Sequence, residues 1–179
     1  MTYYPPGSGV PYPPRGPKVR ADIFDLYLLR PRDGSFDVLQ LRRAEEPLAG
    51  TWQPVMGHVE AGESTLVALA REAAEELDLN LADEESCPDL FALEQVHPFF
   101  LPELDAIVFS PRFVVVVQRG HVLSFDQEHD AHRWLPLESA APAFMWPGQR
   151  AAIAEIKAVL DPSQHATLSA LRIDRSKLV

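Results

Sequence analysis

Cysteine is almost absent from this sequence, and so are long apolar runs. Cys87 is the one cysteine among the 179 residues. An internal disulfide and a cysteine-rich zinc site are therefore excluded, and a reducing, cytoplasmic setting is expected. No apolar run approaches the roughly 20 residues that cross a bilayer, and the N-terminus lacks the apolar core of a signal peptide. The sequence predicts a cytoplasmic protein that does not enter a membrane.

Positive charge is also scarce. The chain has 16 lysines and arginines against 26 acidic residues, which gives a formal net charge of −10. A broad basic surface, which binds DNA or RNA through its phosphates, is therefore not expected. A small phosphorylated partner remains compatible with this charge, because a bound metal ion reverses the local field.

Proline is concentrated at the start of the chain. Residues 1–17 hold six of the 17 prolines. Proline donates no backbone hydrogen bond and fixes φ, so we expect this segment to be a flexible, irregular arm. The alternative is an arm that packs on another subunit through its tyrosines, Tyr3, Tyr4 and Tyr12.

The remaining chain has the composition of one globular domain, with 46% hydrophobic and 23% charged residues. Apolar and β-branched runs predict strands at 19–29, 36–41, 91–96, 106–110, 113–118 and 132–137. Helical periodicity predicts a helix after Ser64 and another from 147 to 160. Residues 97–103 contain two prolines and are expected to form a loop. This order favours an α/β fold over residues 18–160, with a tail at 161–179.

The helix after Ser64 carries negative charge in an unfavourable pattern. Glu72, Glu75 and Glu76 fall within an arc of about 100° on its surface. Each like-charge pair at this spacing costs about 0.2–0.5 kcal/mol in an isolated helix. Glu75 and Glu76 also lie near the C-terminal end, where the helix dipole disfavours negative charge. A cation is expected to offset this charge, and a hard divalent metal with oxygen ligands is the leading candidate.

The ends and the apolar face of this helix can also be predicted. Ser64 is the expected N-cap. Asp78 or Asn80 is expected to adopt the left-handed conformation after the last turn. The face that packs on the core is predicted to contain Leu66, Ala70, Ala73 and Leu77.

The stretch from residue 57 to residue 79 resembles the Nudix box, G-x5-E-x7-R-E-U-x-E-E-x-G-U, in which U is aliphatic. The matching residues are Gly57, Glu63, Arg71, Glu72, Glu75, Glu76 and Leu79. Ala73 fills the first aliphatic position, and Asp78 replaces the late glycine. The resemblance implies the Nudix fold, a mixed β-sheet between helices in an α/β/α sandwich.

The resemblance also implies a chemistry. Nudix enzymes hydrolyse a nucleoside diphosphate linked to another group, with Mg²⁺ or in some cases Mn²⁺. By this resemblance Glu75 and Glu76 are metal ligands, and Glu72 is either a ligand or the base that activates water. Elementary chemistry agrees, because Mg²⁺ takes carboxylate and phosphate oxygens and lowers the pKa of its bound water.

Further residues are implied around these glutamates. Gly57, Glu63 and Arg71 resemble the group that supports the loop against the helix, and the backbone carbonyl of Met56 resembles a further metal ligand. Many family members take one more carboxylate ligand from a distant segment. Glu128 is the leading candidate for it, because a tryptophan follows His129 at a recurrent spacing, and the alternatives are Asp126 and Asp130.

Candidate substrate contacts complete the predicted site. Arg43 resembles a phosphate-binding position, and a guanidinium suits phosphate. Trp52 is the candidate for stacking on the rest of the substrate. Core packing is the alternative for Trp52 and for the other aromatic candidates, Phe24, Tyr27, Phe99, Phe100 and Trp146. Histidines that could act as acid, base or phosphate contact are His58, His97 and His129.

Three short motifs narrow the expected substrate. The segments T-W-Q-P-V-M-G-H-V-E, E-H-x4-W and W-P-G-Q-R resemble the dihydroneopterin triphosphate and deoxynucleoside triphosphate pyrophosphohydrolase branch of the family. A dinucleoside polyphosphate hydrolase is a second interpretation. A non-catalytic, nucleotide-binding or regulatory module is a third, although three intact glutamates argue against it. Dimers are common in the family, so a homodimer is among the expected states.

Overall fold

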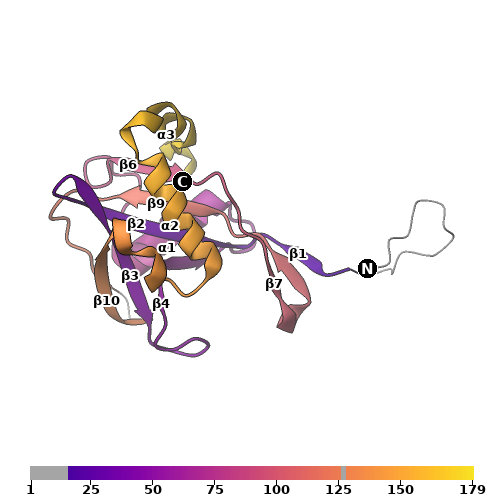
Figure 1. The fold of residues 1–179 in the computed structure, drawn as a ribbon. Coiled ribbons are helices and arrows are strands. Elements are labelled where there is room, and N and C mark those ends of the chain that lie inside the picture. Colours follow the sequence, from indigo (N-terminus) through magenta and orange to yellow (C-terminus); the bar gives the residue numbers. More distant parts are fainter. Residues whose placement is uncertain (1–15, 126–127) are drawn as a thin grey trace.

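The computed structural model describes residues 16–125 and 128–179. Its centre is a mixed seven-stranded sheet (Figure 1). The main strand order is β10-β3-β2-β9-β6; β4 pairs with β3, and β5 pairs with β2. Only β2 and β9 run parallel among these pairs. The strands are β2 (Ile23–Arg32), β3 (Ser35–Arg43), β4 (Trp52–Gln53), β5 (Val55–His58), β6 (Asp89–Ala92), β9 (Arg112–Val116) and β10 (His129–Pro136).

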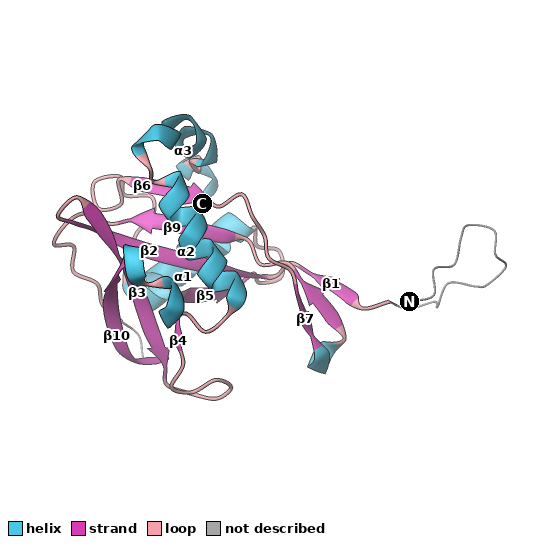
Figure 2. Ribbon diagram, in the orientation of Figure 1, coloured by secondary structure: helices cyan, strands magenta, loops and turns pink. Residues whose placement is uncertain are grey.

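Helices cover both faces of this sheet (Figure 2). The α-helices are α1 (Thr65–Leu77), α2 (Pro147–Val159) and α3 (His165–Leu171). Leu26 and Leu28 of β2 pack in the cluster that contains α1, whereas Tyr27 and Leu29 pack in the cluster that contains α2. Alternate residues of a strand point to opposite faces, so one strand supplies both cores. The predicted α/β/α sandwich with a mixed sheet is confirmed.

A second, three-stranded sheet has the order β1-β8-β7. It consists of β1 (Lys18–Arg20), β8 (Ala106–Val108) and β7 (Phe99–Leu101). The prediction of a loop across 97–103 was wrong, because β7 and a 3-10 helix, η1 (Pro102–Leu104), lie there. The two prolines flank β7 instead of interrupting it, so the strand loses no ladder hydrogen bond. Short 3-10 helices also occur at η2 (Leu137–Ser139), η3 (Ala141–Ala143), η4 (Pro162–Gln164) and η5 (Arg175–Lys177).

Helix α1 begins and ends as its sequence predicts. The Ser64 side chain accepts a hydrogen bond from the amide of Val67 at 3.3 Å. Asp78 has φ 53° and ψ 38°, the left-handed conformation that commonly ends a helix. Its amide donates to the carbonyls of Ala73 and Ala74, which satisfies groups at the helix end. Asp78 therefore takes the place of the late glycine of the box.

The buried face of α1 lies slightly to one side of the predicted one. Ala73 and Leu77 are fully buried, as expected, but Leu66 and Ala70 are only partly buried. Leu69 is fully buried and was not predicted. This shift brings Glu76 to the edge of the core, where it is 5% exposed.

The predicted tail at 161–179 packs on the main sheet. Ile173 donates its amide to the carbonyl of Leu90 at 3.0 Å, and Leu178 is 4% exposed in the core cluster of α1. The guanidinium of Arg175 donates to the carbonyls of Leu81 and Cys87. The last residues therefore cover one edge of the domain.

The N-terminal arm and the absence of a membrane span were also predicted from the sequence. Residues 1–15, with most of the predicted arm and its three tyrosines, lie outside the described residues, and so does Asp126. Of the helices in the described ranges, none is long and apolar enough to cross a membrane.

Candidate active site

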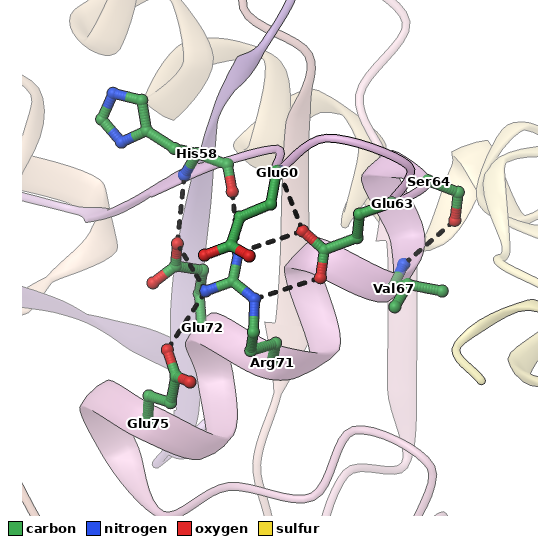
Figure 3. A network of polar contacts seen from close by, with 8 residues as sticks. All are labelled: His58, Glu60, Glu63, Ser64, Val67, Arg71, Glu72 and Glu75. Atoms are coloured by element: carbon green, nitrogen blue, oxygen red, sulfur yellow. Dashed lines mark hydrogen bonds and ion pairs between the residues drawn. The ribbon is translucent and has the colours of Figure 1, made fainter.

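Arg71 lies at the centre of a polar network that joins α1 to the loop before it (Figure 3). Its guanidinium forms a two-point contact with Glu63, at 3.0 and 3.1 Å, and donates to the carbonyl of His58 at 2.9 Å. The second oxygen of Glu63 also accepts from the amide of Glu60 at 3.0 Å. The contact with Glu63 raises the pKa of Arg71, and Arg71 and then the Glu60 amide lower the pKa of Glu63. Both groups are therefore held in their charged forms.

Two of the three helix glutamates join this network. Arg71 Nη1 lies 3.1 Å from Oε1 of Glu72 and 3.1 Å from Oε2 of Glu75. The same Glu72 oxygen accepts a hydrogen bond from the amide of His58 at 3.1 Å. Arg71 therefore offsets part of the like-charge repulsion along α1. The side chain of Glu72 is 15% exposed and that of Glu75 is 60% exposed, so Glu72 is the more firmly placed carboxylate.

Gly57 lies where the loop backbone presses against α1. A Cβ at this position would lie 2.2 Å from the Phe24 ring and 2.7 Å from Cγ of Glu72. Real side chains do not tolerate such distances, so a larger residue would displace Glu72 or Phe24. The glycine of the box is thus required for close approach, and it places the backbone of β5, including Met56, beside the helix.

Glu76 faces a different neighbour. Its Oε2 lies 3.9 Å from Nδ1 of His129, and both side chains are largely buried. His129 is the first residue of β10 and directly follows Glu128, whose carbonyl accepts a hydrogen bond from the amide of Ala44 at 2.8 Å. The fold thus brings the Glu128 segment next to α1, although the two are far apart in sequence. The Glu128 side chain is exposed.

Asp130, an alternative to Glu128, is already engaged elsewhere. Its two oxygens accept from Arg42 at 2.6 and 3.0 Å. This contact lowers the pKa of Asp130, so the carboxylate stays charged and paired with Arg42. Of the two described candidates, Glu128 is therefore the one whose carboxylate is more available to a metal ion.

The two predicted substrate contacts, Arg43 and Trp52, lie on opposite faces of the main sheet. Arg43 of β3 is the cross-strand partner of His129, so it shares a face with the neighbour of Glu76. Its Nε donates to the carbonyl of Glu45 at 3.2 Å. Trp52 of β4 instead pairs with Arg42, which points to the opposite face.

A cluster around Trp52 was not predicted. The guanidinium of Arg133 lies over the Trp52 ring at 4.1 Å, and that of Arg42 lies 5.8 Å away. Arg133 donates twice to Oε1 of Gln40, at 2.9 and 2.7 Å, and the buried Gln40 donates to the carbonyl of Ala143 at 3.2 Å. Burial lowers the pKa of Arg133. The register of β10 on β3 decides this contact, and no local motif indicates it.

The donor atoms match a hard divalent metal in kind. Carboxylate oxygens and a backbone carbonyl are the ligands that Mg²⁺ and Mn²⁺ prefer. Within residues 16–125 and 128–179, however, no three His, Cys, Asp or Glu side chains are gathered closely enough to hold an ion as they stand. Glu72 and Glu75 point at Arg71, whereas Glu76 lies beside His129. The donors fit the metal chemically, and gathering them requires side-chain rotation on a fixed helix.

Comparison with known proteins shows which family the chain resembles. The model of the NUDIX domain family matches residues 19–156. Over 115 residues the chain is 31% identical to the asymmetrical bis(5′-nucleosyl)-tetraphosphatase of Sus scrofa, covering 61% of this chain and 67% of that protein. It is also 34% identical over 115 residues to an octanoyltransferase of Myxococcus xanthus, covering 63% of this chain. The chain spans only 30% of the length of that second relative.

Solved structures share the fold. A binary complex of a C. elegans Ap4A hydrolase superposes with a TM-score of 0.63 at 20% identity, covering 78% of this chain and 97% of that one. The E. coli dihydroneopterin triphosphate pyrophosphohydrolase gives 0.62 at 22% identity, covering 77% and 99%. The family model spans well over half of the chain and includes the whole glutamate network. The chain therefore belongs to the Nudix family of hydrolases, which act on phosphoanhydrides.

Proposed function

We propose that this protein is a Mg²⁺-dependent pyrophosphohydrolase that cleaves a phosphoanhydride bond of a nucleoside or pterin triphosphate. The observation that carries the proposal is the Arg71 network, which fixes Glu63 and the loop to α1 and leaves three glutamates on one side of that helix. A helix face built only for stability would not gather this charge. The three short motifs that resemble the dihydroneopterin triphosphate and deoxynucleoside triphosphate branch support the triphosphate class.

The metal would be held by carboxylates from two segments. Glu72, Glu75 and Glu76 supply oxygens from α1, and Glu128 and the carbonyl of Met56 would complete the set. When bound, Mg²⁺ or Mn²⁺ neutralises charge on phosphate oxygens and lowers the pKa of its bound water. Arg71 and Glu63 do not touch the substrate in this scheme. They position α1 against the loop, so that the ligands converge.

The other residues have roles in proton transfer and substrate binding. Water attacks phosphorus, the bond from phosphorus to the bridging oxygen breaks, and a base accepts the proton of the water. We assign Glu72 to that role or to ligation, and the hydrogen bond from the His58 amide, which restricts the Glu72 carboxylate, supports this assignment. Arg43 would bind a phosphate group by charge and hydrogen bonding. For Trp52, with Arg133 over its ring, to stack on a planar base, the substrate would extend around the sheet edge from the face that carries Arg43.

A second substrate class is supported by a specific observation. The Sus scrofa relative, at 31% identity, is a bis(5′-nucleosyl)-tetraphosphatase. Its likeness extends to sequence, whereas the structural neighbours at 20–22% identity show the fold alone. We therefore keep a dinucleoside polyphosphate as the alternative substrate of the same site.

One experiment distinguishes these proposals. The purified chain is incubated with Mg²⁺ and a panel of nucleoside triphosphates, dihydroneopterin triphosphate and dinucleoside polyphosphates, and products are identified by mass. Release of pyrophosphate and a monophosphate from a triphosphate supports the leading proposal. Preferential cleavage of a dinucleoside tetraphosphate replaces it with the alternative. Binding without any product under Mg²⁺ and Mn²⁺ contradicts both.

A further inference from the structure

The loop at residues 44–51 joins β3 to β4 and projects from the end of the main sheet (Figure 1). It connects three parts of the proposed site. Arg43, the proposed phosphate contact, is the last residue of β3, and Trp52 is the first residue of β4. The amide of Ala44 donates to the carbonyl of Glu128 at 2.8 Å. A side chain on this loop therefore lies close in the chain to both proposed substrate contacts.

Leu48 of this loop has an unusual backbone conformation for its residue type. Its φ is 74°, in the left-handed region, and its side chain is apolar. Residues other than glycine rarely adopt this conformation, and asparagine and aspartate adopt it far more often than the rest. The other non-glycine residues with positive φ in the described part of the chain are all aspartates, Asp33, Asp78 and Asp105. The leucine side chain cannot form the local hydrogen bond that helps an aspartate there.

Two polar side chains hold Leu48 in this conformation. The carbonyl of Leu48 accepts from the hydroxyl of Thr51 at 2.7 Å and from the amide of Thr51 at 3.1 Å. The Thr51 hydroxyl in turn accepts from Nε2 of Gln53 at 2.7 Å, and Gln53 is only 5% exposed. A buried residue of β4 is thus connected through Thr51 to the loop. A strained backbone persists where its surroundings fix it, and such positions cluster at ligand sites.

Arg43 closes the base of the same loop. Its amide donates to the carbonyl of Thr51 at 3.0 Å, and its carbonyl accepts from the amide of Gly50 at 2.8 Å. Its Nε donates to the carbonyl of Glu45 at 3.2 Å. The residue proposed to bind phosphate therefore also fixes the loop that carries Leu48.

The side chains of the loop fit the uncharged part of a substrate. Leu48 is 38% exposed, so an apolar side chain faces solvent. Glu45 and Glu46 are also exposed, and their negative charge disfavours a polyphosphate at this part of the loop. Apolar contact with a planar ring would remove the Leu48 side chain from water.

We propose that Leu48 is a specificity-determining residue that packs against the base of a nucleotide, while the phosphates lie at the glutamates of α1. This inference rests on the proposed function, because it assigns the attached group of the same substrate. The left-handed backbone, held by Thr51 and Gln53, keeps the leucine side chain in place before the nucleotide binds.

Calorimetric titration of the full chain with Mg²⁺ tests the proposal without turnover. The probes are the α,β-methylene analogues of the four common nucleoside triphosphates, and methylenediphosphonate, which has the phosphorus groups but no base. Leu48→Asn keeps the size of the side chain and suits the left-handed backbone, but it loses the apolar contact. The dissociation constant of the nucleotide analogue that binds most tightly should rise about 5- to 10-fold. That of methylenediphosphonate should not change.

Two further variants are matched controls. Leu48→Met keeps an apolar side chain, so it should recover most of the affinity that Leu48→Asn loses. Asp105→Asn changes another exposed residue with positive φ, which lies beside the three-stranded sheet, and it should leave every dissociation constant unchanged. Thermal unfolding shows whether each variant keeps the fold, and Leu48→Asn should unfold no earlier than the wild-type chain, because its backbone is less strained.

Three results overturn the proposal. They are an unchanged affinity of the folded Leu48→Asn variant for nucleotide, an equal loss of affinity for methylenediphosphonate, and a wild-type chain that binds none of the nucleotide analogues. Failure of the proposed function is distinguishable from these results. A loss of affinity that requires the base, in a chain that hydrolyses no nucleotide, would support the role of Leu48 and contradict the proposed enzyme.

Discussion

The loop and helix from Gly57 to Leu79 and the sheet edge around Trp52 both hold arginines against polar groups, but they are assembled differently. Arg71 finds all its partners within 13 residues of itself, at Glu63, His58, Glu72 and Glu75. Arg133 instead meets Gln40, which is 93 residues away in the chain. Local spacing encodes the first region, and the register of β10 on β3 creates the second. We propose that the first carries the phosphate chemistry and that the second recognises what is attached to the phosphates.

If the two regions have these separate roles, the largest loss of activity should follow from changing a glutamate of α1. Glu76→Gln keeps the size of a side chain that is 5% exposed but removes its charge. The rate of hydrolysis should fall at least about 100-fold, because a metal ligand is lost. Glu85→Gln, a change of an exposed acid in the loop after α1, is the control. Activity assays and thermal unfolding measure the two effects separately. Near-normal turnover of Glu76→Gln would remove this residue from the site.

A smaller loss of activity is expected from a change at Arg71, which holds the loop against α1. Arg71→Lys keeps the charge but loses the planar fork that reaches Glu63, His58 and Glu75 together. The rate should fall about 10- to 100-fold, and more Mg²⁺ should be needed for half-maximal activity. Metal titration of the rate checks this. An unchanged metal requirement would mean that Arg71 serves stability alone.

Gly57→Ala tests the close contact between loop and helix. The new methyl group would overlap the Phe24 ring and Cγ of Glu72. The free energy of unfolding should fall by about 1–3 kcal/mol. Gly16→Ala is the control, because a Cβ at Gly16 meets no atom within 4 Å. Urea unfolding of both variants measures the difference in stability. Equal stability of the two variants would contradict the claim that position 57 requires glycine.

The smallest effect is expected at the sheet edge. Trp52→Leu removes the ring under Arg133, so KM for the substrate should rise about 3- to 10-fold with little change in kcat. Trp134→Leu is the comparison, because Trp134 also has an arginine over its ring, Arg30 at 4.4 Å, but lies on the face of the sheet that α1 covers, so the pair shows which face contributes to binding. Steady-state kinetics compares the two. An equal rise of KM in both variants would contradict a specific role for Trp52.

The difference between the two regions also explains what the sequence could predict. Ser64 and the choice between Asp78 and Asn80 follow from short spacings, and the resemblance to the Nudix box implies the pair of Glu63 and Arg71. The structure shows Ser64 as the N-cap, Asp78 as the left-handed residue and the contact between Glu63 and Arg71. The strand β7 pairs with β8, the next strand along the chain, and it was missed because the two prolines that flank it predicted a loop. The packing of Leu178 depends on contacts with distant elements, so local patterns missed it. Arg133 was missed for the same reason, since neither its side-chain type nor its neighbours in sequence indicate Gln40 or Trp52.

The proposed metal site lies between these two cases. Glutamates at set spacing are the proposed donors, but their orientation depends on Arg71 and on His129, which belongs to β10. The sequence indicates which residues lie on one face of α1 and not where their carboxylates point. The physical reason is that helix geometry fixes Cβ positions, whereas long side chains choose among rotamers according to their neighbours.

The most direct test of the metal site is product release from nucleotide substrates with Mg²⁺ and with a chelator, compared between the wild-type chain and a variant in which Glu72, Glu75 and Glu76 are all glutamine. Hydrolysis should require the metal in the wild-type chain and should be lost in the variant, while both chains unfold cooperatively. Hydrolysis that persists with the chelator, or that survives in the folded variant, would contradict a metal-dependent site on α1.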